Sequence, residues 1–277
     1  VAVIGAGQMG QGIAQVFATA GFNVILNDID SAAIEKGLAT LTRSLNKLAD
    51  KEMLSEEPAT IAARITGSTD FSALVAAELV VEAATENEVL KHKIFSQLDK
   101  ICPASTILAS NTSSISITRL AAVTERPDKI VGLHFMNPVP LMKLIEVIKG
   151  LQTSEETYQS MLEVADKLNK TAVTSQDRPG FIVNRILMPM INEAIFTLYE
   201  GVGSAAEIDE AMKLGAAHPM GPLALADLIG LDTCLSIMQV LHEGFSDSKY
   251  RPCPLLKQMV DAGYLGRKTG RGFYQYD

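Results

Sequence analysis

Short apolar runs separated by polar stretches recur along the first two thirds of the chain. Residues 1–4, VAVI, form an apolar run that stops at a glycine, which is the pattern of a buried parallel strand. A glycine turn then opens a helical stretch, and NVILND at 23–28 is a second strand candidate. A strand, a helix and a strand within residues 1–28 predict a βαβ unit.

Four further apolar runs have the length of strands, and helical patterns separate most of them. Residues 31–57 are rich in charge and predict one or two long helices inserted between two strands. This alternation predicts an α/β fold with a doubly wound sheet of the Rossmann type. The four strand candidates are residues 78–84, 106–111, 129–135 and 143–149.

The pattern changes after about residue 177, where helical patterns replace the strand-like runs. Ser204 and Glu207, three residues apart, form a capping-box signature at the start of one of these helices. We therefore predict two domains. Residues 1–177 form the Rossmann-type domain, with its helical insertion near 31–57, and residues 178–277 form a smaller all-helical C-terminal domain.

The composition excludes some classes of partner. The chain has 277 residues, with 24 basic and 32 acidic side chains and a formal net charge of −8. That balance gives no overall attraction to nucleic acid or to an anionic membrane surface, so neither is an expected partner. An anionic small ligand would instead need a local basic patch.

No apolar run approaches the ~20 residues of a membrane-spanning helix. The three cysteines, Cys102, Cys234 and Cys253, form no CxxC pair, so the sequence indicates neither a metal site nor a disulfide framework. This usage fits a reducing compartment. We expect the cytoplasm, or the mitochondrial matrix if a transit peptide has been removed upstream of Val1.

Residues 5–10, GAGQMG, form a G-x-G-x-x-G string between a predicted strand and a predicted helix. In that context Gly5 permits the tight turn, Gly7 lets the backbone approach a pyrophosphate, and Gly10 allows close helix–strand packing. The alternative is a glycine turn used only for packing. The residues expected to contact a dinucleotide are Gly5, Gly7, Gln8, Met9 and Gly10.

Asp28 closes the second predicted strand, where a carboxylate can bind both ribose hydroxyls of an adenosine. A 2′-phosphate there would be repelled, and no arginine follows directly, so the expected cofactor is NAD rather than NADP. The alternative is that Asp28 is only a turn residue and that Asp30 shares its role.

The stretch GLHFMNPVPLMKLIEVI, residues 132–148, places polar residues in an otherwise apolar run. Hydride chemistry at a nicotinamide needs a group that moves a proton to or from the substrate oxygen. His134 lies near the carboxyl end of a predicted strand, where doubly wound sheets bind their ligands. A buried Glu146 needs a partner, and pairing with His134 would fix the imidazole tautomer. The alternative is a core histidine with satisfied hydrogen bonds.

Together these residues resemble the L-3-hydroxyacyl-CoA dehydrogenase family, which includes 3-hydroxybutyryl-CoA dehydrogenases. The resemblance covers essentially the whole chain and rests on several blocks in the expected order. Besides residues 132–148, the blocks are SNTSSISIT (110–118), RPGFIVNRI (178–186), HPMGPLALADLIGLD (218–232) and GRKTGRGFY (266–274).

The resemblance implies a role for each matching residue. His134 would act as the general base in oxidation and the general acid in reduction, and Glu146 would orient it. Ser113 and Asn184 would hydrogen-bond the substrate 3-oxygen or support its orientation. Glu86, Lys91, Ser113, Asn137 and Lys268 would lie around the cofactor, and Ser44 and Lys51 would contact the CoA moiety.

Three of these assignments have structural alternatives. Ser113 could cap a helix that begins in the stretch SISITRLAAV. Asn184 could be a structural asparagine bonded to backbone. Arg43, Lys47 and Lys51 recur on one helix face, as either a solvated stripe or a basic rim that attracts the phosphates of CoA.

The resemblance implies NAD-dependent interconversion of a short-chain L-3-hydroxyacyl-CoA, such as 3-hydroxybutyryl-CoA, and its 3-ketoacyl-CoA, as in fatty acid metabolism and β-oxidation. It also implies a C-terminal domain that binds substrate and forms a homodimer. Two alternatives remain open. One is a dehydrogenase of free hydroxy or sugar acids on the same fold, and the other is a non-enzymatic protein like the family's eye-lens relatives.

Overall fold

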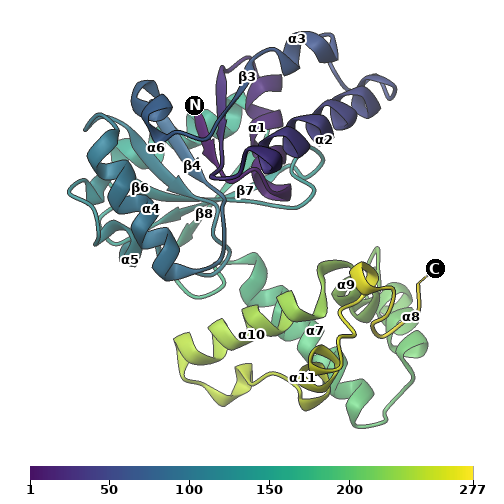
Figure 1. Ribbon diagram of the computed structural model, residues 1–277. Coiled ribbons are helices and arrows are strands. Elements are labelled where there is room, and N and C mark those ends of the chain that lie inside the picture. The colour runs from purple at the N-terminus through teal and green to yellow at the C-terminus, as the bar shows by residue number, and fades with distance from the viewer. Residues whose placement is uncertain (277) are drawn as a thin grey trace. The chain divides into compact units, whose positions relative to one another are not determined.

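The computed structural model describes residues 1–276, and the chain divides into two compact units after Arg178. Unit 1, residues 1–178, runs from purple to teal in Figure 1, and unit 2, which begins at Pro179, runs from green to yellow. The sequence interpretation placed this boundary one residue earlier, after residue 177.

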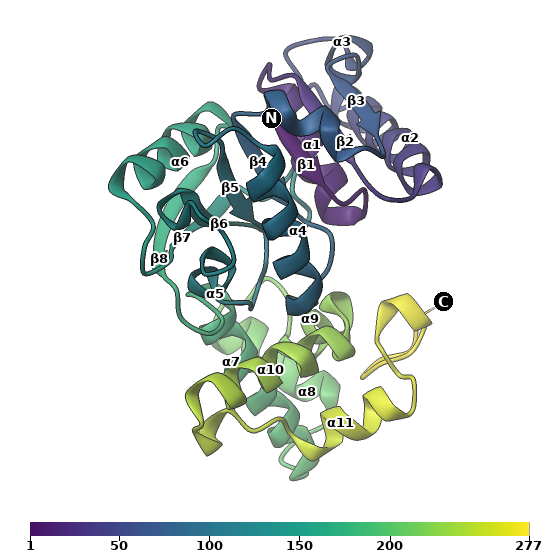
Figure 2. The same ribbon diagram turned by 60° about the vertical axis from the view of Figure 1, so that its left-hand side comes forward.

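Unit 1 is built on an eight-stranded sheet in the order β3-β2-β1-β4-β5-β6-β7-β8. Neighbouring strands are parallel except β6 and β7, which are antiparallel. Helices lie on both faces of the sheet (Figures 1 and 2), so the predicted doubly wound fold is confirmed. The strands are β1 (Ala2–Ile4), β2 (Val24–Asn27), β3 (Ile65–Ser68), β4 (Leu79–Glu82), β5 (Ile107–Ser110), β6 (Ile130–Phe135), β7 (Leu144–Lys149) and β8 (Thr171–Gln176). The α-helices of unit 1 are α1 (Gln8–Thr19), α2 (Ser31–Ala49), α3 (Pro58–Ala62), α4 (Glu88–Ile101), α5 (Ile117–Ala121) and α6 (Glu155–Lys167).

The two edge strands, β3 and β8, were absent from the sequence prediction. Each pairs with only one neighbour, and most of its side chains are not buried. Their sequences, ITGS and TAVTSQ, therefore lack the continuous apolar run that marks the central strands.

The predicted helical stretch 31–57 is too long, because α2 ends at Ala49. Its start is fixed by Asp30, whose carboxylate accepts a hydrogen bond from the Ala32 N–H. Beyond its end, Glu52 adopts a left-handed backbone conformation with φ of 56°, which does not continue a helix. The next helix, α3, begins at Pro58, because proline fits the first turn of a helix.

Successive side chains of β6 and β7 point to opposite faces of the sheet, and this places His134 and Glu146 away from the main apolar cluster of unit 1. Leu133 and Phe135 of β6 and Ile145 of β7 pack in one apolar cluster with side chains of α1 and α6. Because successive side chains of a strand point to opposite faces, His134 and Glu146 lie on the other face of the sheet. The helices of the first face, α1 and α6, therefore do not contact this pair through that cluster.

Unit 2 confirms the predicted all-helical C-terminal domain. α8 begins with the predicted capping box, in which the Ser204 hydroxyl accepts from the Glu207 N–H and the Glu207 carboxylate accepts from the Ser204 N–H. The α-helices are α7 (Val183–Tyr199), α8 (Ala205–Gly215), α9 (Pro222–Ile229), α10 (Leu231–Phe245) and α11 (Pro254–Asp261).

No single helix within residues 1–276 is both long and apolar enough to cross a membrane. α9 and α10 pass that test only together, and the pair is bent by 98°. Leu223 of α9 and Leu241 of α10 are buried in the apolar core of unit 2.

One buried carboxylate holds the C-terminal tail against α9 within unit 2. Asp227 of α9 is 1% exposed and accepts hydrogen bonds from the N–H groups of Phe273 and Tyr274 and from the Tyr276 hydroxyl. A Cβ at Gly272 would lie 1.9 Å from an Asp227 carboxylate oxygen, so only glycine fits there. This contact gives the GRKTGRGFY block a structural role.

The three cysteines are buried, free thiols. Burial raises the pKa of each thiol, and it raises the pKa of Cys234 to about 12. We expect less than one thiol to react promptly with Ellman's reagent at pH 8 in the native protein, and three to react in 6 M guanidinium chloride, because the thiolate is the reactive form. Rapid labelling of the native protein would contradict this burial.

Candidate active site

The glycine turn joins β1 to α1 in the geometry that a dinucleotide requires. Gly5 has a φ of +98°, and a Cβ at Gly10 would lie 1.7 Å from the Gly5 carbonyl oxygen. Gly7 is the N-cap of α1, has no capping side chain, and would have no atom within 4 Å of an added Cβ. The turn therefore borders open space at Gly7, and no N-cap side chain occupies the first-turn N–H groups, those of Gln8 and Met9 included, as a pyrophosphate site needs.

Asp28 lies against this turn, directly after β2. Its Oδ2 accepts a hydrogen bond of 2.7 Å from the Ala6 N–H, and its Oδ1 accepts one of 3.1 Å from the Asp30 N–H. Asp30 itself caps α2 through its Oδ1. The two carboxylates thus have separate positions, and Asp28 is the one placed at the glycine turn.

His134 and Glu146 face each other across the antiparallel β6–β7 pair. The register places the two residues directly opposite, and His134 Nδ1 lies 2.7 Å from Glu146 Oε2. His134 is 7% exposed and Glu146 is fully buried. A charge-assisted hydrogen bond in such an environment holds the ring in one orientation. His134 is the penultimate residue of β6, so the pair lies toward the carboxyl end of that strand.

Glu86 holds Ser113 through two hydrogen bonds. Its Oε1 accepts from the Ser113 N–H at 2.5 Å and from the Ser113 hydroxyl at 2.7 Å, while its Oε2 accepts from the Thr112 hydroxyl. The N-cap of α5 is Ser116, whose hydroxyl accepts from the Arg119 N–H. The alternative that Ser113 caps this helix is therefore wrong.

Glu82, the last residue of β4, was missed in the sequence prediction. Its fully buried carboxylate accepts from the Lys91 ammonium at 2.5 Å, the Ser110 hydroxyl at 2.8 Å and the Ala84 N–H at 2.9 Å. Lys91 Nζ also lies 4.0 Å from Glu86 Oε2. Lys91 thus links Glu82 to the carboxylate that holds Ser113. The signal for Glu82 was present, because it is an acidic residue on an apolar strand, as Glu146 is.

Two family models match this chain. The one described as "3-hydroxyacyl-CoA dehydrogenase, NAD binding domain" matches residues 1–178, and the one described as "3-hydroxyacyl-CoA dehydrogenase, C-terminal domain" matches residues 180–276. The chain belongs to the 3-hydroxyacyl-CoA dehydrogenase family. It is an NAD-dependent enzyme of this family.

Individual relatives agree over the full length of this 3-hydroxyacyl-CoA dehydrogenase. The 3-hydroxybutyryl-CoA dehydrogenase of Bradyrhizobium diazoefficiens is 58% identical, with 100% of this chain and 94% of the relative aligned. The probable 3-hydroxybutyryl-CoA dehydrogenase of Bacillus subtilis is 57% identical, with 100% and 97% aligned. The crystal structure of the (S)-3-hydroxybutyryl-CoA dehydrogenase of Ralstonia eutropha superposes with a TM-score of 0.96 at 56% identity, covering 100% of this chain and 98% of that one.

Asn137 of the dehydrogenase connects the loop after β6 to the glycine turn. Its side-chain oxygen accepts a hydrogen bond of 3.2 Å from the Gln8 side chain, although the two residues are far apart in the sequence. The same loop packs on α1, since a Cβ at Gly12 would lie 2.8 Å from Val139. Two of the residues predicted to surround the cofactor are therefore in direct contact.

The remaining predicted site residues of the dehydrogenase fall into two groups. Asn184 is buried in the first turn of α7, in unit 2, and no hydrogen bond within the described residues engages its side-chain amide. Lys268, also in unit 2, forms an ion pair with Asp232, at 2.5 and 2.7 Å from the two carboxylate oxygens. In unit 1, Ser44 is half-buried on α2 and Lys51 is exposed just after it.

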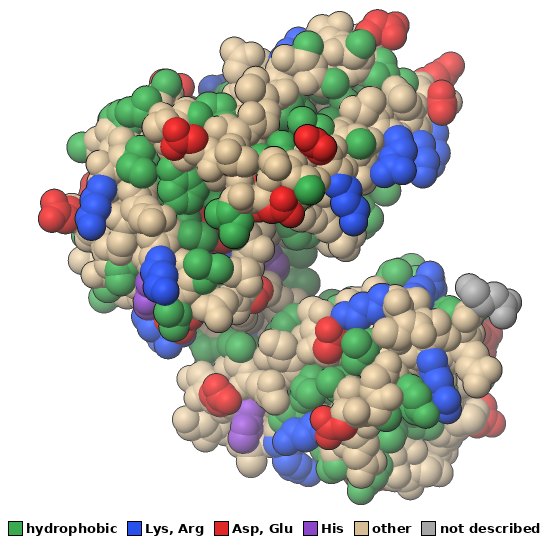
Figure 3. Space-filling view, in the orientation of Figure 1, with side chains coloured by type: hydrophobic (Ala, Val, Ile, Leu, Met, Phe, Trp, Pro, Cys, Tyr) green, Lys and Arg blue, Asp and Glu red, His purple; other side chains and the backbone are tan. Residues whose placement is uncertain are grey.

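The surface near α2 carries the predicted basic stripe. Arg43, Lys47 and Lys51 are exposed, and none has a carboxylate within 4 Å among the described residues. Figure 3 shows lysine and arginine side chains gathered on the surface beside α2. No group of three or more potential metal ligands occurs within residues 1–276.

Proposed function

We propose that this enzyme interconverts a short-chain L-3-hydroxyacyl-CoA, specifically (S)-3-hydroxybutyryl-CoA, and the corresponding 3-ketoacyl-CoA. The observation that carries this proposal is the His134–Glu146 pair, placed in the same unit as the glycine turn. The chain length and the S configuration are supported by the activities named for the relatives from Bradyrhizobium diazoefficiens and Ralstonia eutropha.

His134 moves the proton of the reaction. Because Nδ1 faces Glu146, Nε2 is the ring nitrogen that takes the proton of the 3-hydroxyl group in oxidation and returns it in reduction. Glu146 keeps the imidazole in this tautomer and stabilises the imidazolium that forms. The glycine turn and the start of α1 would hold NAD, which would supply the hydride acceptor for the oxidation at C3.

Ser113 and Asn184 orient the 3-oxygen of the substrate. The Ser113 hydroxyl donates to Glu86 in this structure, and by turning from Glu86 it can donate instead to the substrate 3-oxygen, whose own proton goes to His134. The Asn184 amide can donate to the same oxygen as negative charge develops on it. In the cofactor role proposed for Lys268, this side chain would exchange Asp232 for a cofactor oxygen.

The basic stripe near α2 attracts the phosphates of CoA. Replacing Lys51 with glutamine is expected to raise the KM for acetoacetyl-CoA about 2- to 5-fold at low salt without changing kcat. This range is expected because one exposed charge contributes ~1 kcal/mol or less to binding. Lys100→Gln, an exposed lysine at the end of α4, is the matched control. An equal change in KM in both variants would contradict the basic-rim assignment. So would an effect of Lys51→Gln on KM that does not depend on salt concentration.

The proposed reaction is tested by its stereochemistry. Purified enzyme with NAD is mixed with (S)-3-hydroxybutyryl-CoA or with its R enantiomer, and NADH formation is followed by absorbance. We expect oxidation of the S enantiomer and at most a background rate with the R enantiomer. Oxidation of the R enantiomer at a comparable rate would mean that the substrate pose is wrong.

We also propose that the enzyme forms a homodimer through unit 2. It exposes several large apolar side chains, and exposed apolar surface of this kind is common at interfaces between subunits. Light scattering over a concentration series tests this, and a monomer mass throughout would contradict it. The exposed side chains include Ile186, Tyr199, Val202, Leu214 and Leu228.

A further inference from the structure

Unit 1 contains a cavity whose lining includes none of the residues assigned to the catalytic pair, the cofactor or CoA. It has a volume of about 420 Å³ and lies between α1 and the segments that follow α2, β6 and α6. Gln15 and Val16 of α1 line one side, and Lys143 and Lys170 line another. α1 and α6 cover the face of the sheet opposite the His134–Glu146 pair. Its volume falls in the range of small-molecule sites.

Three lysines line this cavity, and no aspartate or glutamate is among its described lining residues. This is unusual in a chain with a formal net charge of −8. Neither Lys143 nor Lys167 has a carboxylate within 4 Å among the described residues, and both side chains are exposed. The cavity is therefore a local positive site whose charge the surrounding residues do not neutralise.

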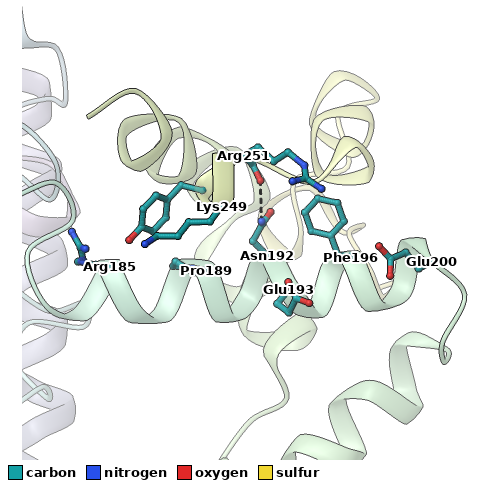
Figure 4. Close-up of a pocket in the computed structure, with 9 residues that line it drawn as sticks. Arg185, Pro189, Asn192, Glu193, Phe196, Glu200, Lys249 and Arg251 are labelled. Carbon is teal, nitrogen blue, oxygen red and sulfur yellow. Dashed lines mark hydrogen bonds between the residues drawn. The ribbon is translucent and has the colours of Figure 1, made fainter. Parts of the chain in front are cut away.

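A cavity in unit 2, of about 530 Å³, provides the contrast (Figure 4). Its three cations, Arg185, Lys249 and Arg251, share the lining with Glu193 and Glu200. The Arg185 guanidinium lies 3.9 Å from the centroid of the Phe245 ring, and Figure 4 shows the Asn192 amide bonded to the backbone oxygen of Arg251. There the lining residues already supply opposite charge, so that cavity indicates no anion.

Two polar groups of the lysine-lined cavity have hydrogen-bond donors left for a ligand. Lys170 donates to the carbonyl oxygens of Val139 and Met142 at 2.8 and 2.6 Å, so one of its three ammonium protons remains for a ligand. Gln15 is 2% exposed, and its side-chain nitrogen has no hydrogen-bond acceptor within the described residues. An unpaired buried amide is unfavourable, and a bound acceptor would relieve that cost.

The rest of the lining is apolar. Leu48, Leu54 and Leu168 contribute to the wall. Met53, Leu141 and Met142 also line the cavity and are among the exposed large apolar side chains of the chain. A small inorganic anion would leave this wall in contact with water, whereas a ligand with an apolar body would cover it.

We propose that this cavity binds an organic anion with an apolar body, of the class of medium-chain carboxylates. The carboxylate lies among Lys143, Lys167 and Lys170, and the alkyl chain lies along the apolar wall. The site is separate from the catalytic pair, because His134 and Glu146 lie on the other face of the sheet.

The test is a calorimetric titration of the enzyme with octanoate, in the presence of saturating NAD and acetoacetyl-CoA. These two occupy the active site without reacting, because both are already oxidised. We expect one saturable site per chain. Octanol, which lacks the charge, and inorganic phosphate, which lacks the apolar body, should each bind at least 10-fold more weakly.

Variants then locate the site. The double variant Lys143→Met/Lys167→Met is expected to weaken octanoate binding at least 10-fold and to keep kcat within 2-fold of the wild type, which also shows that it is folded. The matched control Lys93→Met/Lys100→Met, on α4, should bind like the wild type.

Several outcomes would overturn the proposal. Equal binding of octanol would mean an apolar groove without an anion site, and equal binding of phosphate would mean an anion site without an apolar wall. Wild-type affinity in the Lys143→Met/Lys167→Met variant would place the ligand elsewhere. Loss of octanoate binding when NAD and acetoacetyl-CoA are added would place it in the active site. None of these readouts depends on the stereochemistry of the proposed reaction.

Discussion

Replacing His134 with glutamine is expected to lower kcat by about 10²- to 10⁴-fold in both directions of the reaction, the usual contribution of a positioned general acid–base. Glutamine fills similar space and can keep a hydrogen bond to Glu146, but it cannot carry the proton between C3 oxygen and solvent. The glycine turn and Asp28 are unchanged in this variant, so the dissociation constant for NADH should stay within about 3-fold of the wild type. Stopped-flow kinetics and NADH fluorescence titration measure the two quantities.

Two further variants make this prediction specific. Glu146→Gln removes the charge that stabilises the imidazolium and should also lower kcat, by about 10-fold or more. His242→Gln replaces a half-buried histidine of α10 that has no role in the mechanism, and it should leave kcat unchanged. A His134→Gln enzyme that turns over as fast as the wild type would remove the basis of the proposed mechanism.

The second large effect is expected at Glu82. Glu82→Ala leaves the Lys91 amino group 2% exposed and without its partner at 2.5 Å. Removing one partner of a buried ion pair costs ~3–5 kcal/mol, so the free energy of unfolding should fall by about that amount. Urea denaturation followed by circular dichroism measures it. Glu125→Ala, at an exposed glutamate, should change the same quantity by ~0.5 kcal/mol or less.

The double variant Glu82→Met/Lys91→Met separates stability from function. It replaces the ion pair with apolar side chains of similar length, and such replacements are often neutral in stability. We expect it to recover most of the lost free energy of unfolding. It should not recover activity, because Glu86 loses the ammonium that lies 4.0 Å away. The position of the Glu86 carboxylate, and with it the hydrogen bond to Ser113, is then expected to change. A double variant as active as the wild type would show that the linkage from Glu82 to Ser113 has no function.

The central strands and the cofactor turn could be predicted because their signals are local. VAVI is a continuous apolar run and NVILND has the apolar centre VIL, and the glycines between them mark a turn that few other residues could form. The capping box of α8 is equally local, since Ser204 and Glu207 are three residues apart. Such features depend on neighbours in the sequence, so they were recovered.

Contacts between distant segments were harder to predict. The 2.7 Å contact of His134 with Glu146 depends on the β6–β7 register, and a slip of one residue would place the two side chains on opposite faces. Lys91 was placed near the cofactor by the resemblance, but its ion pair with Glu82 depends on how α4 packs on β4. The hydrogen bonds of Asp227 to the tail join residues more than 45 positions apart, which no local pattern encodes.

The central claim is that this enzyme transfers a hydride between NAD and a CoA thioester. The most direct measurement is the rate of loss of nicotinamide absorbance with NADH and acetoacetyl-CoA, beside parallel reactions with NADPH and with free acetoacetate. We predict fast turnover only with NADH and the thioester, because Asp28 repels a 2′-phosphate and the basic stripe near α2 attracts the CoA phosphates. Equal turnover of free acetoacetate would contradict the CoA assignment, and equal turnover with NADPH would contradict the role of Asp28.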